Sequence, residues 1–288
     1  MIRRAPAGRD LRHDLRLLTS PFRVLPDFIV PGEAKCGTTS LYRYLLRHPD
    51  VYAADLKEPN NFIRHPDSRL YCAAHYPLRM TRWWHLRVRR RAFATGEASA
   101  EYLSKPGLAQ RVARMLPEAR VVVLLRDPVA RAWSDYQMFS ARGLETRAFE
   151  ELVERSLRWL SDPDLAPLVD AARHLERSPL RYVLRGMYAE SLRPWLEHFP
   201  AGRVLVIRSE DLYADPGAVL PRVLAHLDLP AADLGPFEVF KKGEYRDAPA
   251  EQTAERLREF YEPGNRALYA LLGQDLRWGG ALGGARAG

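Results

Sequence analysis

The stretch that decides the fold is PDFIVPGEAKCGTTSLYRYLLRHPD, residues 26–50. An apolar run at 28–30 is followed by a loop with two glycines and then by helical spacing over residues 38–48. The loop almost matches G-x-x-x-x-G-K-[ST], a pattern typical of phosphate-binding loops. Thr38 occupies the position of the lysine in that pattern, and Lys35 comes three residues earlier. The stretch therefore predicts a strand, an anion-binding loop and a helix whose first N–H groups face the anion.

Further strands and helices alternate along the chain. The apolar run 119–125 is typical of a buried strand in a parallel sheet, and residues 203–207 predict another strand. Asp127 and Pro128 suit the N-cap and first position of a helix. Residues 180–199, 216–227 and 250–272 also predict helices. This alternation predicts an α/β fold with a central, mainly parallel sheet. Ligands bind at the carboxyl ends of such strands, where 32–40 and 126–134 should both lie.

The composition is that of a globular protein with an anionic partner. The chain has 288 residues and a formal net charge of +8, and only five of its 44 basic residues are lysines. The arginine bias is typical of a GC-rich bacterial gene. No leader-like or membrane-spanning apolar run is present in the sequence, which predicts a cytoplasmic protein. We expect a basic arm at 1–24, one domain at 25–279 and a loose tail at 280–288.

Five motifs, in the same order, resemble those of sulfotransferases that use 3′-phosphoadenosine-5′-phosphosulfate (PAPS). Lys35-Cys36-Gly37-Thr38-Thr39-Ser40 resembles the loop that grips the 5′-phosphosulfate, and residues 123–136 resemble the segment that binds the 3′-phosphate. The resemblance is closest to the heparan sulfate glucosaminyl 3-O- and N-sulfotransferase branch. It rests there on Lys57-Glu58-Pro59-Asn60-Asn61-Phe62, on Phe240-Lys241-Lys242-Gly243 and on residues 257–278.

The resemblance implies a three-layer, P-loop-like fold and a role for each motif. Lys35 would stabilise the leaving phosphate, while Glu58 would act as general base toward the acceptor. Donor-binding residues would be Lys35, Cys36, Gly37, Thr38, Thr39, Ser40, Arg126, Ser134, Tyr188, Lys241, Lys242 and Gly243. Acceptor contacts would be Lys57, Asn61, Glu97 and Ser99. The donor would be PAPS, the product 3′-phosphoadenosine-5′-phosphate (PAP), and no metal ligands are predicted.

One position departs from the family pattern. In Gly96-Glu97-Ala98-Ser99, the related enzymes carry a catalytic lysine where this chain has Ala98. Either Lys35 works alone or an arginine from 87–91 replaces the lysine. Two other functions therefore stay open: a P-loop kinase, disfavoured by Thr38 in place of the lysine, and a nucleotide- or polyanion-binding protein without turnover.

The acceptor is predicted only as a class. The resemblance favours a hydroxyl or amine on a carbohydrate or glycosylated natural product, with specificity in residues 64–91 and 142–177. The segment 83–91, WWHLRVRRR, is predicted as a solvated basic face over core tryptophans, with acceptor binding as an alternative and nucleic acid disfavoured. Oligomeric state is not readable from the sequence.

Overall fold

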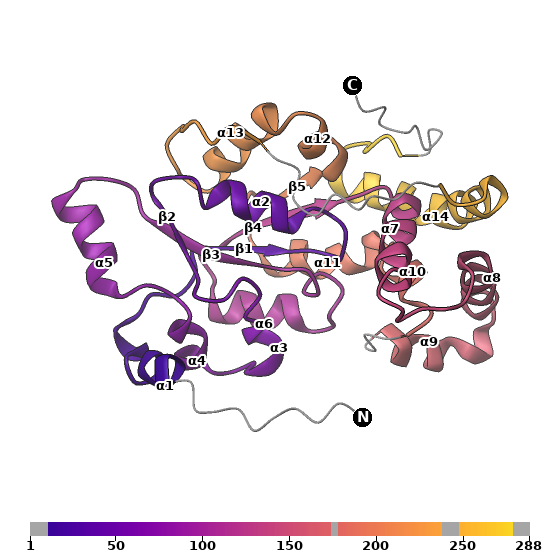
Figure 1. Ribbon diagram of the computed structural model, residues 1–288, viewed down its shortest axis with the longest axis horizontal. Helices are drawn as coiled ribbons and strands as arrows, with labels where there is room; N and C mark the ends of the chain where they lie inside the picture. The colour runs from indigo at the N-terminus through magenta and orange to yellow at the C-terminus, as the bar shows by residue number, and fades with distance from the viewer. Residues whose placement is uncertain (1–10, 174–177, 238–247, 279–288) are drawn as a thin grey trace.

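The computed structural model describes residues 11–173, 178–237 and 248–278. Five strands within these residues form one sheet in the order β2-β3-β1-β4-β5 (Figure 1). Every pairing between neighbouring strands is parallel. The strands are β1 (Phe28–Pro31), β2 (Val51–Ala53), β3 (Ala94–Ser99), β4 (Arg120–Leu125) and β5 (Val204–Arg208). The predicted α/β fold with a central parallel sheet is confirmed.

The strand order creates a switch point at β1. After β1 the chain forms β2, the outermost strand on one side, and then β3, which lies between β2 and β1. It then adds β4 and β5 on the other side of β1. Loops that leave β1, β3 and β4 therefore meet at the carboxyl edge of the sheet, which is the usual place for a ligand in such folds.

Helices cover both faces of the sheet. In Figure 1, α2 (Thr38–Leu45), α12 (Ser209–Ala214) and α13 (Pro216–His226) lie above the sheet, and α6 (Leu108–Met115) and α11 (Tyr188–His198) lie below it. The central strands β3, β1 and β4 are buried between these layers: the side chains of Val121, Val122 and Val123 in β4 have no exposed surface. This explains their continuous apolar run, because a strand covered on both faces has no solvent side.

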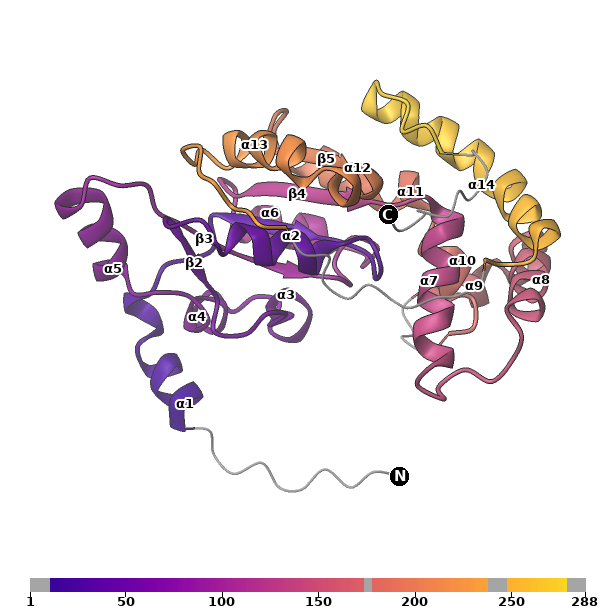
Figure 2. The same ribbon diagram turned by 45° about the horizontal axis from the view of Figure 1, so that its top comes forward.

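A second, helical layer lies beyond the carboxyl ends of the strands (Figure 2). It contains α7 (Pro128–Ser140), α8 (Phe149–Leu160), α10 (Arg181–Leu184) and α14 (Glu251–Leu272). These helices share a hydrophobic core of their own, built around Val129, Phe149, Leu152, Val183 and Leu257. The remaining helical segments are α1 (Leu11–Leu18), η1 (Ser20–Phe22), α3 (Asn61–Arg64), α4 (Arg69–Ala74), α5 (Arg79–Trp83), the π-helical turn η2 (Trp84–Val88), η3 (Pro163–Leu165) and α9 (Ala166–Arg173).

The predicted start of α7 is confirmed in detail. The Asp127 carboxylate accepts a hydrogen bond from the Ala130 N–H at 2.8 Å, and Pro128 is the first helical residue. Asp215 and Pro216 repeat this arrangement at α13. A carboxylate satisfies one of the unpaired N–H groups at a helix start, and proline has no N–H to satisfy.

The prediction of one helix over residues 180–199 is wrong. The chain forms α10 and α11, separated at residues 185–187. A Cβ atom at Gly186 would lie 2.7 Å from the Tyr261 hydroxyl of α14. The tyrosine hydroxyl in turn donates to the Val183 carbonyl at 2.8 Å. Packing against α14 thus decides where the helix ends, and local helical periodicity does not contain that information.

None of the described helices is long and apolar enough to cross a membrane. Residues 11–22 of the predicted basic arm form α1 and η1, and the predicted tail lies outside the described residues.

Gly96 permits the close approach of β1 and β3, and its replacement should destabilise the fold. A Cβ atom there would lie 2.3 Å from the Phe28 carbonyl oxygen and 2.5 Å from its ring. We expect Gly96→Ala to lower the free energy of unfolding by about 2 kcal/mol or more, because a buried strand cannot move aside. Urea unfolding measures this. Gly264→Ala, in α14 with nothing within 4 Å of the added carbon, is the control and should be neutral or stabilising. Equal stability of the two variants would contradict the prediction.

Candidate functional site

The loop between β1 and α2 is held in an uncommon backbone conformation. Lys35 and Gly37 have positive φ angles of 74° and 90°. A Cβ atom at Gly32 would lie 2.2 Å from the Thr38 methyl carbon, and one at Gly37 would lie 2.8 Å from the Tyr213 hydroxyl. Both glycines are therefore required by the path of the loop. A lysine in the left-handed region is disfavoured and is kept there by its surroundings, which is characteristic of functional sites.

The first turn of α2 suits an anion. Its N-cap is Gly37, which offers no side-chain acceptor to the N–H groups of that turn, and no acidic residue occupies the first turn. The helix start therefore combines uncapped N–H donors with the positive end of the helix dipole. The hydroxyl groups of Thr38, Thr39 and Ser40 come from the same turn. This arrangement fits a phosphate group.

Side chains from two neighbouring strand ends fix this loop. The Arg126 guanidinium, directly after β4, donates to the Lys35 carbonyl at 3.2 Å. The Ser209 hydroxyl, directly after β5, donates to the Cys36 carbonyl at 2.7 Å. The predicted meeting of 32–40 with residue 126 is thus observed, and Arg126 lies beside the helix start. Ser209 was not predicted from the sequence, although its position directly after an apolar strand indicates a place at the same edge of the sheet.

Glu58 is placed beside the same helix start by a lysine. The ammonium group of Lys57 donates to the Thr39 hydroxyl at 2.7 Å and to the Glu58 carboxylate at 2.8 Å. The side chain of Glu58 is 37% exposed. A carboxylate that is accessible, ion-paired and adjacent to an anion-binding turn can accept a proton from a group bound there.

Ser134 and Tyr188 are both buried, in different layers of the fold. Ser134 is on α7, in the same turn as the buried, ion-paired residues Arg131 and Asp135. Tyr188 begins α11 and lies against the loop, with its hydroxyl 3.6 Å from the Cys36 sulfur. Contact of either residue with a nucleotide stays a prediction. Lys241, Lys242 and Gly243 lie outside the described residues.

Cys36 is a buried part of the loop, and its contact with the donor stays a prediction. Its side chain has no exposed surface, and burial raises the pKa of its thiol to about 11. A position at a helix start can lower a thiol pKa. Here burial dominates, so the thiol stays protonated at neutral pH and acts as a small filler beneath the helix start.

A group of buried polar side chains lies where β3 ends and α3 begins. Glu97, Ser99 and Asn61 are each at most 1% exposed. Glu97 Oε2, Ser99 Oγ and both amide atoms of Asn61 have no hydrogen-bond partner within the described residues. Glu97 Oε1 accepts from the Tyr102 hydroxyl at 3.2 Å. Acceptor binding by these residues stays a prediction, and their unsatisfied atoms mark a place where further polar contacts are needed.

The prediction that an arginine from residues 87–91 replaces the lysine missing at Ala98 is wrong. Arg91 forms an ion pair with Asp50, which precedes β2. The segment therefore lies at the amino edge of the sheet, and the loop lies at the carboxyl edge. Ala98 itself is buried. The ammonium group of Lys57 lies at the helix start, where it donates to the Thr39 hydroxyl.

A buried ion pair behind the loop was also missed. Glu33 is fully buried, accepts from the Ser104 N–H at 3.1 Å and lies 3.8 Å from the Arg185 guanidinium. Burial raises the pKa of Glu33, while Arg185 opposes that shift. The pair ties the loop to the segment between α10 and α11. Nothing in the sequence near either residue indicates this contact, because 152 positions separate them.

Together, the parallel sheet, the loop and the uncapped helix start define an α/β protein with a site suited to an anion, such as a phosphate group, at the carboxyl edge of its sheet. Comparison with known proteins specifies the family. Residues 25–248 match the sulfotransferase domain family, so the chain belongs to the sulfotransferases.

Similar proteins support this assignment. The chain is 30% identical over 287 residues to mouse heparan sulfate glucosamine 3-O-sulfotransferase 3A1, covering 92% of this chain and 67% of that protein. It is 30% identical over 281 residues to human heparan sulfate glucosamine 3-O-sulfotransferase 6, covering 89% and 75%. It spans about two thirds of the length of the 3A1 and 3B1 relatives. A solved sulfotransferase from Alicyclobacillus acidocaldarius aligns with a TM-score of 0.64 and 29% identity over 88% of this chain and 98% of that one.

Glu97 should make stability depend on pH. Burial raises its pKa from 4.5 to about 8, although the hydroxyls of Tyr102 and Tyr76 offset part of the effect. Between these pH values the folded state binds more protons than the unfolded state, so stability falls as the pH rises. We expect Glu97→Gln to gain several degrees in melting temperature relative to wild type near pH 8–9. The two proteins should converge near pH 5.

Melting curves over this pH range measure the effect. Glu118→Gln, which removes an exposed carboxylate at the other edge of the sheet, controls for the loss of a charge. Parallel profiles for wild type and Glu97→Gln would show that the buried carboxyl does not control the pH dependence.

Proposed function

We propose that the protein transfers a sulfuryl group from PAPS to a hydroxyl or amine group of a carbohydrate or glycosylated natural product. The observation that carries the proposal is the position of Lys57, which joins Glu58 to Thr39 at the helix start. This contact brings a candidate base to an anion-binding turn, in a chain that belongs to the sulfotransferases. PAPS supplies the sulfuryl group when it is bound.

The loop and its neighbours fit the phosphate groups of such a donor. The uncapped N–H groups of α2, with Thr38 and Thr39, can bind the 5′-phosphate, and Lys35 lies at the turn that precedes them. Arg126 can bind the 3′-phosphate because its planar guanidinium can bind two oxygens at once. Positioning and charge stabilisation of this kind account for most of the rate enhancement expected in a group transfer.

Glu58 has the role of base. It is accessible to an acceptor, and Lys57 holds it at the edge of the helix start. A base in this position accepts the proton of the attacking hydroxyl or amine. The same lysine contributes positive charge at the helix start, near the transferred group.

The acceptor class is inferred from the similar proteins. The relatives with about 30% identity are named for heparan sulfate glucosamine, a carbohydrate. A bifunctional heparan sulfate N-deacetylase/N-sulfotransferase of Caenorhabditis briggsae is 28% identical over 206 residues, so both oxygen and nitrogen acceptors fit the relatives. A cytoplasmic location remains part of this proposal.

The nucleotide preference should separate this function from that of a kinase. We expect PAP, with or without Mg²⁺, to stabilise the protein by about 2.7 kcal/mol at 100 times its dissociation constant, whereas ATP stabilises it less. Thermal melting measures this. Arg126→Ala should weaken the PAP effect, and Arg120→Ala, at the other end of β4, should not. Stabilisation by ATP that requires Mg²⁺, with none by PAP, would contradict the proposal and support a kinase.

Replacement of Glu58 should separate an enzyme from a binding protein. We expect Glu58→Gln to lower kcat by about 10²–10⁴-fold, because it removes the base, while the affinity for PAP is unchanged. A screen of glycan acceptors with PAPS, followed by single-turnover rates, measures this. Glu118→Gln, another ion-paired glutamate, should retain full activity. Undiminished sulfuryl transfer by Glu58→Gln would rule out its role as base.

A further inference from the structure

Exposed apolar side chains are concentrated at one end of the molecule. In the described part of the chain, ten of the fifteen large hydrophobic side chains that are exposed belong to residues 11–22 and 78–88. Exposed single hydrophobic residues are ordinary, but a contiguous group marks an interaction surface. The ten are Leu11, Leu15, Leu18, Phe22, Leu78, Met80, Trp83, Trp84, Leu86 and Val88.

Helix α1 presents leucines to solvent and packs through polar residues. Leu11, Leu15 and Leu18 are 77%, 61% and 77% exposed, and their spacing places them on one face of the helix. On the other face, the Arg16 guanidinium donates to the Ala74 carbonyl at 2.7 Å and pairs with Asp55 at 2.8 Å. Among the described residues, these three leucines thus face solvent, and they form an apolar face on which a partner could dock.

Helix α5 and the π-helical turn η2 continue the same pattern. Met80, Trp84 and Val88 recur every four residues and are 73%, 48% and 48% exposed. Trp83, beside them, is 55% exposed. The prediction that the tryptophans of this segment are core residues is therefore wrong. Ion pairs of Arg82 with Asp27 and of Arg91 with Asp50 attach the segment to the sheet and leave the tryptophans outside.

The two segments are joined where η1 ends and α5 begins, and we call the exposed side chains of residues 11–22 and 78–88 together the leucine–tryptophan surface. Arg23 and Leu78 pair as an antiparallel bridge, and the Arg79 guanidinium donates to the Arg23 carbonyl at 3.2 Å. Residues 11–23 and 78–91 are thus adjacent. Figures 1 and 2 show α1 and α5 on the same side of the molecule, away from α7 and α14. The surface lies at the amino edge of the sheet, whereas the loop between β1 and α2 lies at the carboxyl edge.

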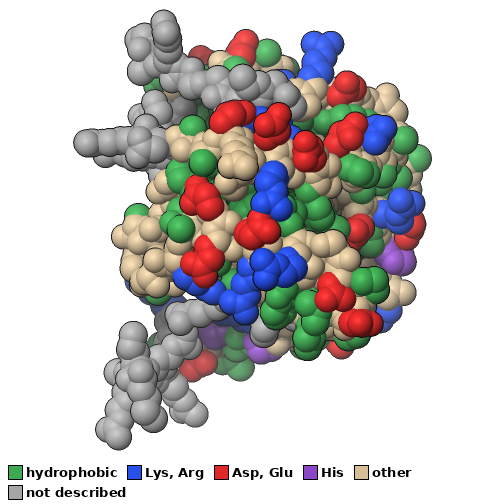
Figure 3. Space-filling view, turned by 90° about the vertical axis from the view of Figure 1, so that its right-hand side faces the viewer, with side chains coloured by type: hydrophobic (Ala, Val, Ile, Leu, Met, Phe, Trp, Pro, Cys, Tyr) green, Lys and Arg blue, Asp and Glu red, His purple; other side chains and the backbone are tan. Residues whose placement is uncertain are grey.

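The leucine–tryptophan surface is also strongly basic. Residues 78–91 contain six arginines and no acidic residue, and residues 11–23 contain three arginines and one aspartate. The opposite end of the molecule, in Figure 3, shows acidic and basic side chains interspersed. Aromatic and aliphatic side chains beside arginines are the composition of helices that lie in the interface of a lipid bilayer.

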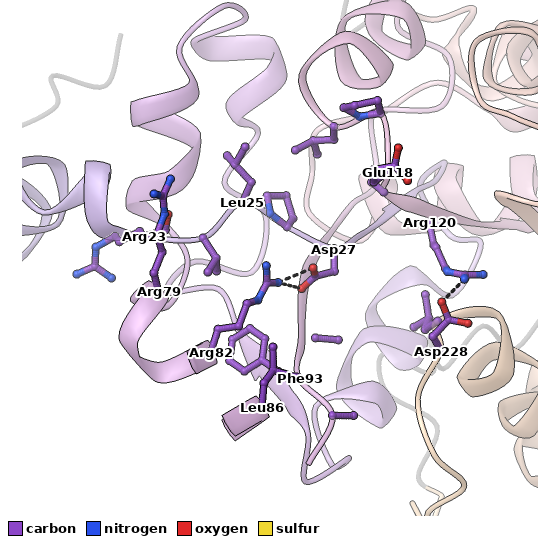
Figure 4. Close-up of a pocket in the computed structure, with 18 of the residues that line it drawn as sticks. Arg23, Leu25, Asp27, Arg79, Arg82, Leu86, Phe93, Glu118, Arg120 and Asp228 are labelled. Carbon is purple, nitrogen blue, oxygen red and sulfur yellow. Dashed lines mark hydrogen bonds and ion pairs between the residues drawn. The ribbon is translucent and has the colours of Figure 1, made fainter. Parts of the chain in front are cut away.

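A cleft beside this surface adds further positive charge. It has a volume of about 940 Å³ and lies between α5 and the amino ends of the strands (Figure 4). Arg82 and Arg120 in its wall are paired with Asp27 and Asp228. Three other arginines of its wall form no ion pair with a carboxylate in the described residues: Arg23, Arg69 and Arg79.

We propose that the leucine–tryptophan surface binds the surface of an anionic lipid bilayer. Leucine, methionine and tryptophan side chains would enter the boundary of the acyl chains, and the arginines would contact phosphate groups. A second copy of the chain fits less well, because the same arginines would face one another. Nucleic acid fits less well, because the leucine face of α1 offers it neither charge nor rings on which bases could stack. The loop between β1 and α2 lies at the other edge of the sheet, so it would stay accessible to its ligand when the protein is bound to a bilayer. The proposal does not depend on the proposed function.

Vesicle binding by the full-length protein tests this. We expect the protein to sediment with phosphatidylcholine vesicles that contain about 30% phosphatidylglycerol, and much less with pure phosphatidylcholine. Met80→Glu/Trp84→Glu should lower the partition coefficient at least about tenfold, because it places charge in the apolar boundary. Leu144→Glu/Leu168→Glu changes side chains that are similarly exposed, at 51% and 54%, but lie outside residues 11–22 and 78–88, and it should bind as wild type does. Circular dichroism spectra and melting temperatures close to those of the wild type should confirm that both variants are folded.

Three results would overturn the proposal. The first is no binding to the anionic vesicles, and the second is equal binding by Met80→Glu/Trp84→Glu, which would indicate adsorption by charge alone. The third is a dimer or a nucleic-acid complex that competes with vesicle binding and is lost in the same variant.

Discussion

The uncapped start of α2 is the feature on which the site depends. Gly37 supplies no side chain to the N–H groups of the first turn, so these groups are available to an anion. Their orientation requires positive φ angles at Lys35 and Gly37, which a free chain would rarely adopt. Hydrogen bonds from Arg126 and Ser209 to the loop carbonyls hold that conformation. Because these two residues follow β4 and β5, the loop is stable only when the sheet has assembled.

The two edges of the sheet have different physical properties. At the carboxyl edge, polar groups converge on a helix start, and buried carboxyl groups such as Glu33 and Glu97 lie behind it with raised pKa values. At the amino edge, arginines and exposed aromatic residues surround a cleft. A parallel sheet separates its two edges by the length of its strands. Chemistry at one edge and attachment at the other can therefore coexist without steric conflict.

Much of the candidate site was predictable from the sequence because it depends on strand ends. The loop after Pro31 and the Arg126-Asp127-Pro128 segment follow apolar runs, and parallel strands bring such ends together. Ser209 follows the same rule and was overlooked. The pairing of Glu33 with Arg185 could not be predicted, because a contact between distant charged residues leaves no local pattern. The exposure of Trp83 and Trp84 was mispredicted because composition does not show which side of a helix faces the protein.

The sequence by itself determined the class of fold, the anion-binding pattern of the loop at residues 32–40 and the resemblance to sulfotransferases. These properties are local: apolar runs, caps and glycine positions act over a few residues, and their order in the chain specifies the topology. Only the tertiary structure decided three other matters. These are the division of the predicted helix 180–199 at Gly186, which packs against Tyr261, the burial of Glu97, and the exposure of three leucines of α1 to solvent. Each of these depends on which distant segment packs against a residue, and that choice is made by the whole core rather than by any one stretch.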